Sequence, residues 1–480
     1  MAHDKADPAP DHHLWRSSSL LARLGVIGME AIEPVVLGAL IAGEPLLLIG
    51  PHGTGKSYLL GRVAAALGLE WRHYNASLLN YDDLVGYPLP DGQGGLRFVR
   101  TPASIWDAQA VFLDEISRCR PDLQNKLFPI VHERRVQGIL LERLVYRWAA
   151  MNPPARDDEP EADAYRGSEP LDPALADRFA FVAEVPTWEG LGERQQEQVI
   201  LRSGEDVSPA ARAQLRAAIE SGRSLLPEVD RALRPQLATY VRLVTAVLRH
   251  AGIECSPRRA ATLLRNVVVV HAARLVREPA ADPGDSACVA LGSSLPHRAA
   301  GLPVDGLKVL AAHREAWKAA GLAPHDPRRF LLLEPDPFRR ALRAVGAESL
   351  PPVEVSGVVA DALASLPAGA RHALAAALFE SGGAARLVAA VAEQCAQLYA
   401  LVAMPQDVRE TVASGSTRLG VWKRVVATLA RHDPAAPETP LVSNLLSGLF
   451  AAGELAVPED VERALGAWRR GRETARELAA

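Results

Sequence analysis

The run Gly50-Pro-His-Gly-Thr-Gly-Lys-Ser57 is the feature that most limits what this chain can fold into. It fits the pattern GxxxxGK[ST] at every fixed position. An apolar run at 46–49 precedes it, and an apolar helical pattern at 58–67 follows it. A strand, a glycine turn and a helix in this order form a loop whose backbone N–H groups and helix N-terminus surround phosphate oxygens. The sequence therefore predicts a site for a nucleoside triphosphate.

Within this site, we expect Lys56 to reach the terminal phosphates and the Ser57 hydroxyl to ligate Mg²⁺. A chance glycine turn is the alternative, but both flanks argue against it. The residues expected to contact the nucleotide are Gly50, Pro51, His52, Gly53, Thr54, Gly55, Lys56, Ser57 and Tyr58.

A second motif, Val111-Phe-Leu-Asp-Glu115, is an apolar strand that ends in two carboxylates. Asp114 is expected to hold Mg²⁺ through water, because this ion prefers oxygen ligands. Glu115 is then placed to polarise the attacking water as a general base. A solvated strand end is the alternative, and the pairing with the glycine turn disfavours it.

Two further positions carry candidate roles. Asn152, in Met151-Asn-Pro-Pro154, ends another strand and is expected to orient the attacking water, with a turn-forming asparagine as the alternative. Arg178 stands just before a strand and is expected to reach the γ-phosphate of a neighbouring subunit as an arginine finger. A surface salt bridge with Asp177 is the alternative role for Arg178.

The run Ser256-Pro-Arg-Arg-Ala260 opens a later helix, since proline suits the first helical position. Arg258 is expected to drop onto the nucleotide from above, and Arg259 is a close second candidate. A solvated charge pair is the alternative for these two residues.

The remaining pattern predicts an α/β domain followed by helices. Short apolar strands that alternate with helices are typical of a parallel sheet covered on both faces. After Pro186 the pattern becomes helical, and from 303 onward no strand pattern stands out. An acidic run at 156–163 is low in apolar residues and is expected to be a mobile insertion. Strands are predicted at 46–49, 71–75, 110–113, 146–151 and 179–185, and helices at 29–42, 58–67, 193–202, 208–221, 233–251, 257–277 and 286–296.

Composition excludes several classes of protein. The 480 residues carry 53 basic and 57 acidic side chains, a net charge of −4, so no global footprint for nucleic acid or a membrane surface is present. The N-terminus lacks the pattern of a signal peptide, and Glu33 and Glu44 interrupt the longest apolar stretch. We therefore expect a cytoplasmic protein with no membrane insertion. Four scattered cysteines without a CxxC pair argue against a zinc site or a disulfide framework: Cys119, Cys255, Cys288 and Cys395.

Taken in order, these motifs resemble the AAA+ ATPases, in particular the MoxR branch, which is close to the dynein-like and McrB-like groups. The resemblance covers residues 20–300. The run Leu113-Asp-Glu-Ile-Ser-Arg118 resembles the LDEI-[NS]-R run of that branch, and Asn125-Lys-Leu and Glu133-Arg-Arg-Val136 resemble the helix and hairpin that follow it. Ser256-Pro-Arg258 matches the second-sensor position. His52 departs from the pattern, since proline is common there.

The resemblance implies a P-loop sheet with strand order 5-1-4-3-2, a helical lid, and ATP with Mg²⁺ bound between the subunits of a hexameric ring. It also implies a motor that couples ATP hydrolysis to the remodelling or assembly of a protein client, with a separate von Willebrand A-domain protein as partner. The division that follows is an arm at 1–22, an AAA+ domain at 23–187, a lid at 188–302 and a helical accessory region at 303–480.

Two other functions stay open at this point. One is a McrB-like nucleic-acid translocase, although the acidic balance and the lack of a DNA-binding motif make nucleic acid an unexpected partner. The other is a nucleotide-gated scaffold with low turnover, against which the Asp114-Glu115 pair and Arg178 argue. Tyr87 and Phe98 stand where the family inserts loops toward the pore, with ordinary packing as the alternative. A basic cluster is expected to be a solvated helix face rather than a nucleic-acid site: Arg328, Arg329, Arg339, Arg340 and Arg343.

Overall fold

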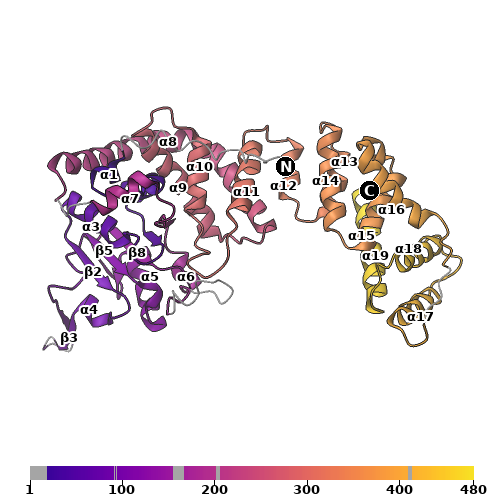
Figure 1. Ribbon diagram of the computed structural model, residues 1–480, viewed down its shortest axis with the longest axis horizontal. Coiled ribbons are helices and arrows are strands. Elements are labelled where there is room, and N and C mark those ends of the chain that lie inside the picture. The colour runs from indigo at the N-terminus through magenta and orange to yellow at the C-terminus, as the bar shows by residue number, and fades with distance from the viewer. Residues whose placement is uncertain are drawn as a thin grey trace. The chain divides into compact units, whose positions relative to one another are not determined.

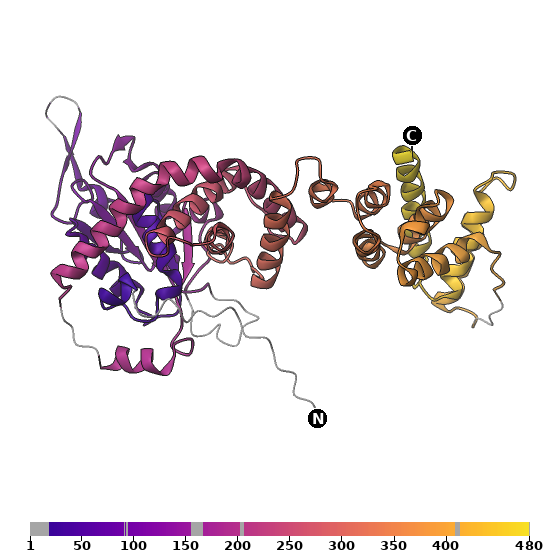
Figure 2. The ribbon, with the colours of Figure 1, turned by 90° about the horizontal axis from the view of Figure 1, so that it is seen from above.

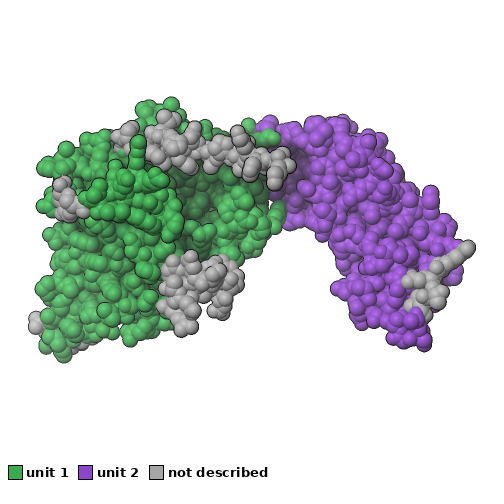
Figure 3. Space-filling model, in the orientation of Figure 1, with its two compact units in different colours: residues 1–321 green, residues 322–480 purple. Residues whose placement is uncertain are grey.

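The structure of the chain is a computed structural model, which describes residues 19–90, 92, 95–154, 167–201, 206–408 and 413–479. It consists of two compact units, residues 1–321 and 322–480, coloured separately in Figure 3. The acidic insertion expected at 156–163 and most of the arm expected at 1–22 lie outside the described residues.

The first unit is built on a parallel five-stranded sheet with the order β2-β5-β8-β1-β9. Counted along the chain, these strands have the order 5-1-4-3-2, so the expected P-loop topology is confirmed. Sequence patterns predicted three of the strands with the bounds that the structure has, and the last strand is shorter than expected at both ends. The sheet consists of β1 (Leu46–Ile49), β2 (Trp71–Asn75), β5 (Ala110–Asp114), β8 (Tyr146–Met151) and β9 (Phe181–Glu184).

Both faces of the sheet are covered, as its near-continuous apolar strands predict. On one face, Leu47 and Val111 pack with Leu127 and other apolar side chains of α4, α5 and α6. On the other face, Leu46 and Leu48 are also buried, and α2 and α3 contact β5, β8 and β9. These elements are η2 (Glu30–Ile32), α2 (Glu33–Ala42), α3 (Lys56–Leu67), α4 (Tyr81–Val85), η3 (Ile116–Arg118), α5 (Pro121–Glu133) and α6 (Pro173–Ala176).

Two antiparallel hairpins are attached to this core: β3 (Tyr87–Pro90) with β4 (Leu96–Val99), and β6 (Arg135–Val136) with β7 (Ile139–Leu140). Figures 1 and 2 show the first hairpin standing out from the body of the unit. Tyr87 is 56% exposed on it, whereas the ring of Phe98 packs against Trp106 with ring centroids 6.4 Å apart. Of the two aromatic side chains singled out in the sequence, only Tyr87 is free to touch another molecule.

A layer of helices completes the first unit beside the α/β part (Figure 1). The helix α8 contacts α2, α3, α9 and α11, and α10 contacts α9 and α11. Because α11 packs on α8 and α10, it belongs to the first compact unit, although the accessory region was expected to begin at 303. The helices are α1 (Leu20–Arg23), α7 (Glu193–Ile200), α8 (Pro209–His250), α9 (Pro257–Leu275), α10 (Pro283–Gly292) and α11 (Gly306–Ala320).

The prediction of two separate helices at 208–221 and 233–251 is wrong, because α8 runs through both without a break. Gly222 is a site of close approach rather than a turn, since a Cβ built there would lie 2.2 Å from Cδ1 of Ile41. Pro227 and Pro235 lie inside the helix and each remove one backbone donor. Packing of α8 on its neighbouring helices outweighs these local costs.

The second unit is wholly helical in its described residues, in keeping with the lack of a strand pattern there. Its core joins apolar side chains from nearly all of its helices, with Trp468, Phe450 and Leu374 fully buried. Within the described part of the chain, no helix combines the length and apolar character needed to cross a membrane. The elements are α12 (Pro327–Leu333), α13 (Pro337–Gly346), α14 (Pro352–Ser365), α15 (Ala368–Glu380), η5 (Gly383–Arg386), α16 (Ala389–Ala403), α17 (Thr417–Leu429), α18 (Thr439–Ala451) and α19 (Glu459–Ala479).

Candidate functional site

The predicted motifs meet at the carboxyl edge of the sheet. Strand register pairs Ile49 with Met151 and Leu113 with Ala149, so the strands β1, β5 and β8 end side by side. The glycine turn follows β1, Asp114 ends β5 and Asn152 follows β8. Parallel sheets bind ligands at this edge, where the loops after neighbouring strands converge.

The glycine turn has the backbone of a phosphate-binding loop. Gly53 and Gly55 have φ angles of 77° and 84°, in the left-handed region that side chains with a Cβ disfavour. The Thr54 hydroxyl donates a 2.8 Å hydrogen bond to the carbonyl of Pro51 and closes the turn. Helix α3 begins at Lys56, so its unpaired N–H groups and partial positive charge face the turn.

Lys56 connects the turn to the end of β8. Its ammonium group donates to the carbonyls of Gly50 and Pro51 at 2.7 and 2.8 Å, and to Oδ1 of Asn152 at 3.3 Å. Burial lowers the pKa of Lys56, while the nearby carboxylates of Asp114 and Glu115 oppose that change. The structure therefore brings Lys56 and Asn152 together, as their predicted roles require.

Asp114 is the centre of the polar contacts at this edge. Its Oδ2 accepts a 2.8 Å hydrogen bond from the Ser57 hydroxyl and lies 3.2 Å from Nε2 of His73, and its Oδ1 accepts one from the backbone N–H of Glu115 at 3.0 Å. Burial alone would raise the pKa of Asp114, but these hydrogen bonds outweigh it and hold the pKa below its usual value. A hydroxyl and an ionised carboxylate in contact are oxygen donors that fit Mg²⁺.

Glu115 adopts an unusual backbone conformation at the start of η3. Its φ of 55° lies in the left-handed region, which is uncommon for a residue with a side chain. Its Oε2 forms an ion pair with Arg118, whose Nε lies 2.9 Å away. The Glu115 side chain is 37% exposed. Glu115 lines a pocket of about 300 Å³ together with Lys56, Ser57 and Asn152.

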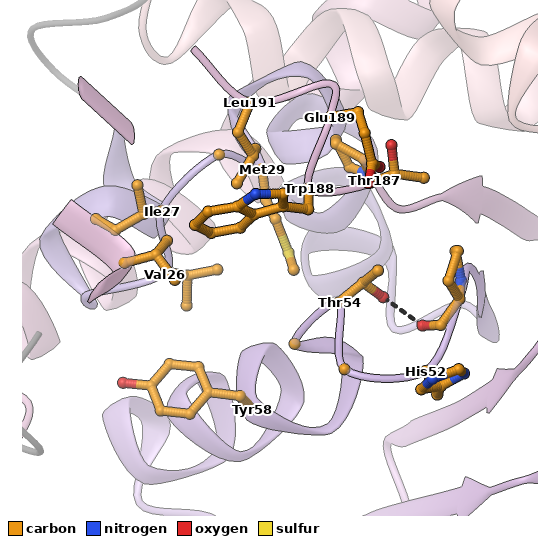
Figure 4. A pocket seen from close by; sticks show the side chains of 16 residues that line it. Val26, Ile27, Met29, His52, Thr54, Tyr58, Thr187, Trp188, Glu189 and Leu191 are labelled. Atoms are coloured by element: carbon orange, nitrogen blue, oxygen red, sulfur yellow. Dashed lines mark hydrogen bonds between the residues drawn. The ribbon is translucent and has the colours of Figure 1, made fainter. Parts of the chain in front are cut away.

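A larger pocket of about 620 Å³ continues from the other side of the glycine turn. Figure 4 shows the indole of Trp188 across this pocket from the ring of Tyr58, with Val26 and Ile27 beside it. The flat apolar walls next to a phosphate-binding turn suit a nucleotide base. Sequence reasoning included Tyr58 but missed Trp188, which follows β9 by only a few residues.

Arg178 and Arg258 lie apart from both pockets, and neither is among the described residues that line them. The guanidinium of Arg178 lies 4.2 Å from the ring centroid of Phe128 and donates to the carbonyl of Ala174 at 2.6 Å. Burial lowers the pKa of Arg178, and the positive charge of Arg258 adds to that effect. The two arginines therefore share one region of the surface, and the expected contact of Arg258 with the nucleotide stays a prediction.

Arg259 is a buried anchor, with 2% of its side chain exposed. Its guanidinium donates to Oδ1 and the carbonyl of Asp177 at 3.0 and 2.7 Å, and to the carbonyls of Phe179 and Ala180. All of these hydrogen bonds connect α9 to the segment before β9. The guanidinium of Arg259 therefore stabilises the fold, and its donors are not available to a nucleotide.

Comparison with known families supports this geometry. Residues 45–179 match the AAA domain of the dynein-related subfamily. Residues 45–179 therefore form an AAA-type ATPase domain of the dynein-related branch. The matched residues run from the start of β1 to the end of the segment that carries Arg178, so they contain the glycine turn, the Asp114-Glu115 pair and Asn152.

Comparisons with solved structures and with curated proteins add no evidence about activity. A solved structure of a “putative ATPase” from Cytophaga hutchinsonii is 19% identical, covers 52% of this chain and 77% of its own, and has a TM-score of 0.36. A likeness this distant carries no argument about activity. No curated protein matches the chain.

Three arginines of the basic cluster in the second unit are paired with acidic side chains. Arg328 contacts Glu354 at 2.7 Å, Arg339 contacts Glu477 at 2.7 Å, and Arg343 contacts Glu334 at 3.0 Å. Arg340 donates to the carbonyl of Glu334, and Arg329 is buried. These ion pairs offset much of the positive charge of the cluster. The four cysteines are all unpaired, and Cys119 and Cys395 are buried.

Proposed function

We propose that this AAA+ ATPase acts as a ring motor of the MoxR type, which binds ATP with Mg²⁺ between neighbouring copies and remodels a protein client. The placement of Arg178 and Arg258 supports the ring. They lie together on a surface outside the pockets that hold Lys56 and Trp188. Two guanidinium groups that are separate from their own nucleotide site suit the γ-phosphate of a neighbouring copy.

The roles within one site follow from the contacts. Trp188 and Tyr58 receive the base, the glycine turn and the N-terminus of α3 receive the phosphates, and Lys56 shifts from the loop carbonyls to the terminal phosphates. Ser57 and Asp114 hold Mg²⁺, which when bound neutralises phosphate charge.

Glu115 polarises the attacking water, and Asn152 orients it. For this step the carboxylate of Glu115 has to accept a hydrogen bond from water in addition to, or in place of, the one from Arg118. Arg178 and Arg258 of the neighbouring copy then stabilise the charge that develops on the transferred phosphoryl group.

Client binding is assigned to two surfaces. The hairpin β3–β4 carries the exposed ring of Tyr87, and the helical second unit, with its own core, serves as a docking module for a separate partner such as a von Willebrand A-domain protein. A hexamer is the assembly that the MoxR resemblance implies.

The first test concerns the base and the ring together. Glu115→Gln should bind ATP as the wild type does and lose hydrolysis by about 100-fold or more, because it removes the group that activates water. Arg178→Ala should also lose hydrolysis. Mixing the two inactive proteins should restore turnover, since an intact site of one copy then meets an intact arginine of the other.

Each arm has an outcome that contradicts the proposal. Undiminished turnover by Glu115→Gln would remove Glu115 as the base, and no recovery in the mixture would remove the role of Arg178 between copies. Capture of partners by the Glu115→Gln protein in ATP, followed by mass spectrometry, tests the client. Recovery of nucleic acid with a nuclease subunit would instead favour a translocase.

A further inference from the structure

Ser168 lies beside Asn152, the first residue after β8, although the two are 16 positions apart in the sequence. The Ser168 hydroxyl oxygen lies 3.0 Å from the hydroxyl oxygen of Ser117 and 3.1 Å from the carbonyl oxygen of Asn152. One residue further on, the backbone N–H of Glu169 donates to the carbonyl of Ser117 at 3.1 Å. Ser168, Ser117 and Asn152 are 2%, 1% and 7% exposed, so water does not compete for these contacts.

The two groups that Ser168 joins belong to two different candidate catalytic elements. Ser117 is the middle residue of η3, the short turn that begins directly after Glu115. Asn152 follows β8 and directs its side-chain oxygen to Lys56. A shift of η3 changes the aim of the Glu115 carboxylate, and a shift of the chain at Asn152 changes the position of its amide.

We propose that Ser168 is a positioning residue for ATP hydrolysis. Its hydroxyl holds the turn that carries Glu115 and the strand end that carries Asn152 in one relative geometry, so that both side chains address the same water molecule. The proposal rests on the roles of Glu115 and Asn152 proposed above, and it adds a residue that touches neither nucleotide nor water.

The chemistry of a hydroxyl suits this task. It has one proton to donate and lone pairs to accept, so Ser168 can donate to the carbonyl of Asn152 while it accepts from Ser117. Alanine at this position removes both contacts and leaves two buried polar groups short of a partner. Displacement of a reacting group by an ångström can reduce a rate strongly, whereas nucleotide contacts elsewhere stay in place.

A second side chain ties the downstream end of the same segment. Gln124 of α5 donates to the carbonyl of Cys119 at 3.0 Å and accepts from the backbone N–H of Asp172 at 3.1 Å. Asp172 caps α6 through its own side chain. The segment 168–172 is therefore held to the middle of η3 at Ser117 and to the residue after η3, Cys119, and Ser168 makes the contact nearer to the site.

The test is Ser168→Ala in the full-length chain. We expect kcat for ATP to fall about tenfold, with KM and the dissociation constant for ATP changed less than twofold, since the hydroxyl aligns groups and does not bind nucleotide. The matched control is Ser356→Ala in the second unit. Ser356 is also 2% exposed, donates to the carbonyl of Pro352 and accepts from the N–H of Val388. It should lose similar stability without a change in kcat.

Two further variants separate positioning from general damage. Ser168→Thr keeps the hydroxyl and should recover most of the rate. In an Asn152→Ala background, Ser168→Ala should lower the remaining rate by a smaller factor than in the wild type, because one of the two groups that it positions is already absent. If Ser168→Ala does not fold, Ser168→Cys replaces it, with the same expectation.

Unchanged kcat in Ser168→Ala, an equal loss in Ser356→Ala, or independent multiplication of the Ser168 and Asn152 effects would each overturn the proposal. These results differ from a failure of the proposed function. That failure would appear as full turnover in Glu115→Gln or Asn152→Ala, whatever Ser168 does.

Discussion

Arg258 and Arg259 are consecutive residues with opposite environments. Arg258 has 46% of its side chain exposed and approaches Asp177 only to 3.8 Å, whereas Arg259 is buried against the same carboxylate. Helical geometry separates them, since consecutive side chains on a helix point about 100° apart. One side chain therefore anchors the fold and its neighbour is left for another molecule.

We expect Arg259→Ala to lower the free energy of unfolding by about 3 kcal/mol, because it removes the buried guanidinium that donates to Oδ1 and the carbonyl of Asp177 and to the carbonyl of Phe179. Arg258→Ala should change it by less than about 0.5 kcal/mol and instead slow ATP turnover in the assembled protein. Denaturant unfolding and ATPase assays of both variants check this. Equal stability loss in the two variants would contradict the division of roles.

Trp188 has a role that nucleotide binding can test. It is 44% exposed at the mouth of the larger pocket, opposite Tyr58 (Figure 4). Stacking of a base on an aromatic ring contributes about 1 to 3 kcal/mol, so Trp188→Ala should weaken ATP binding about tenfold or more. Titration calorimetry measures the affinity. Trp188→Phe keeps an aromatic face and should bind within about threefold of the wild type; equal weakening of both would exclude stacking.

At the scale of elements, close packing of helices decides where the chain requires glycine. In the second unit, α15 crosses α19 so closely that a Cβ on Gly369 would lie 1.9 Å from the carbonyl oxygen of Ala464. Gly471 on α19 likewise has no room, since its Cβ would lie 2.7 Å from that of Ala373. Because these two positions carry no side chain, α15 and α19 can approach each other closely within that core.

Gly369→Ala should therefore destabilise the second unit by about 3 kcal/mol, since a backbone carbonyl cannot move aside as a flexible side chain can. The control is Gly357→Ala on α14, where a Cβ meets nothing within 4 Å. This variant should be neutral or more stable by up to about 1 kcal/mol, because alanine favours a helix. Thermal unfolding of both proteins measures the difference, and similar melting temperatures would contradict the crossing geometry.

On the scale of the whole molecule, the nucleotide site belongs to one compact unit. Residues 26–191 supply the lining of the larger pocket except for Val199, and the smaller pocket is lined by residues 52–152. The second unit has its own core and contributes no residue to either pocket among those described. The described lining of both pockets therefore lies within the first unit.

A protein cut after Gly321 should bind ATP within about threefold of the full-length affinity, since every described pocket residue is retained. Residues 322–480 should fold alone and show a cooperative unfolding transition. Calorimetry and ATP titration of the two pieces check this. Loss of ATP binding from the first piece would mean that the second unit supports the site.

Much of the fold could be read from local patterns. The strands β1, β2 and β8 were predicted with their observed bounds, because short apolar runs between turn signals describe buried parallel strands. Helix α8 was split in the prediction, since glycine and proline are breakers only where packing does not compensate for them. Its continuity depends on contacts with helices far away in the sequence.

The sequence by itself determined the phosphate-binding turn, the Asp114-Glu115 pair, Asn152 and the strand order that the resemblance implied. These features are contiguous motifs whose chemistry requires particular residue types at particular spacings. Only the tertiary structure decided that His73 contacts Asp114, that Trp188 faces the base pocket, that Arg259 is buried, and that Ser168 joins Ser117 to Asn152. Each of these depends on a contact between distant segments, which no local pattern specifies.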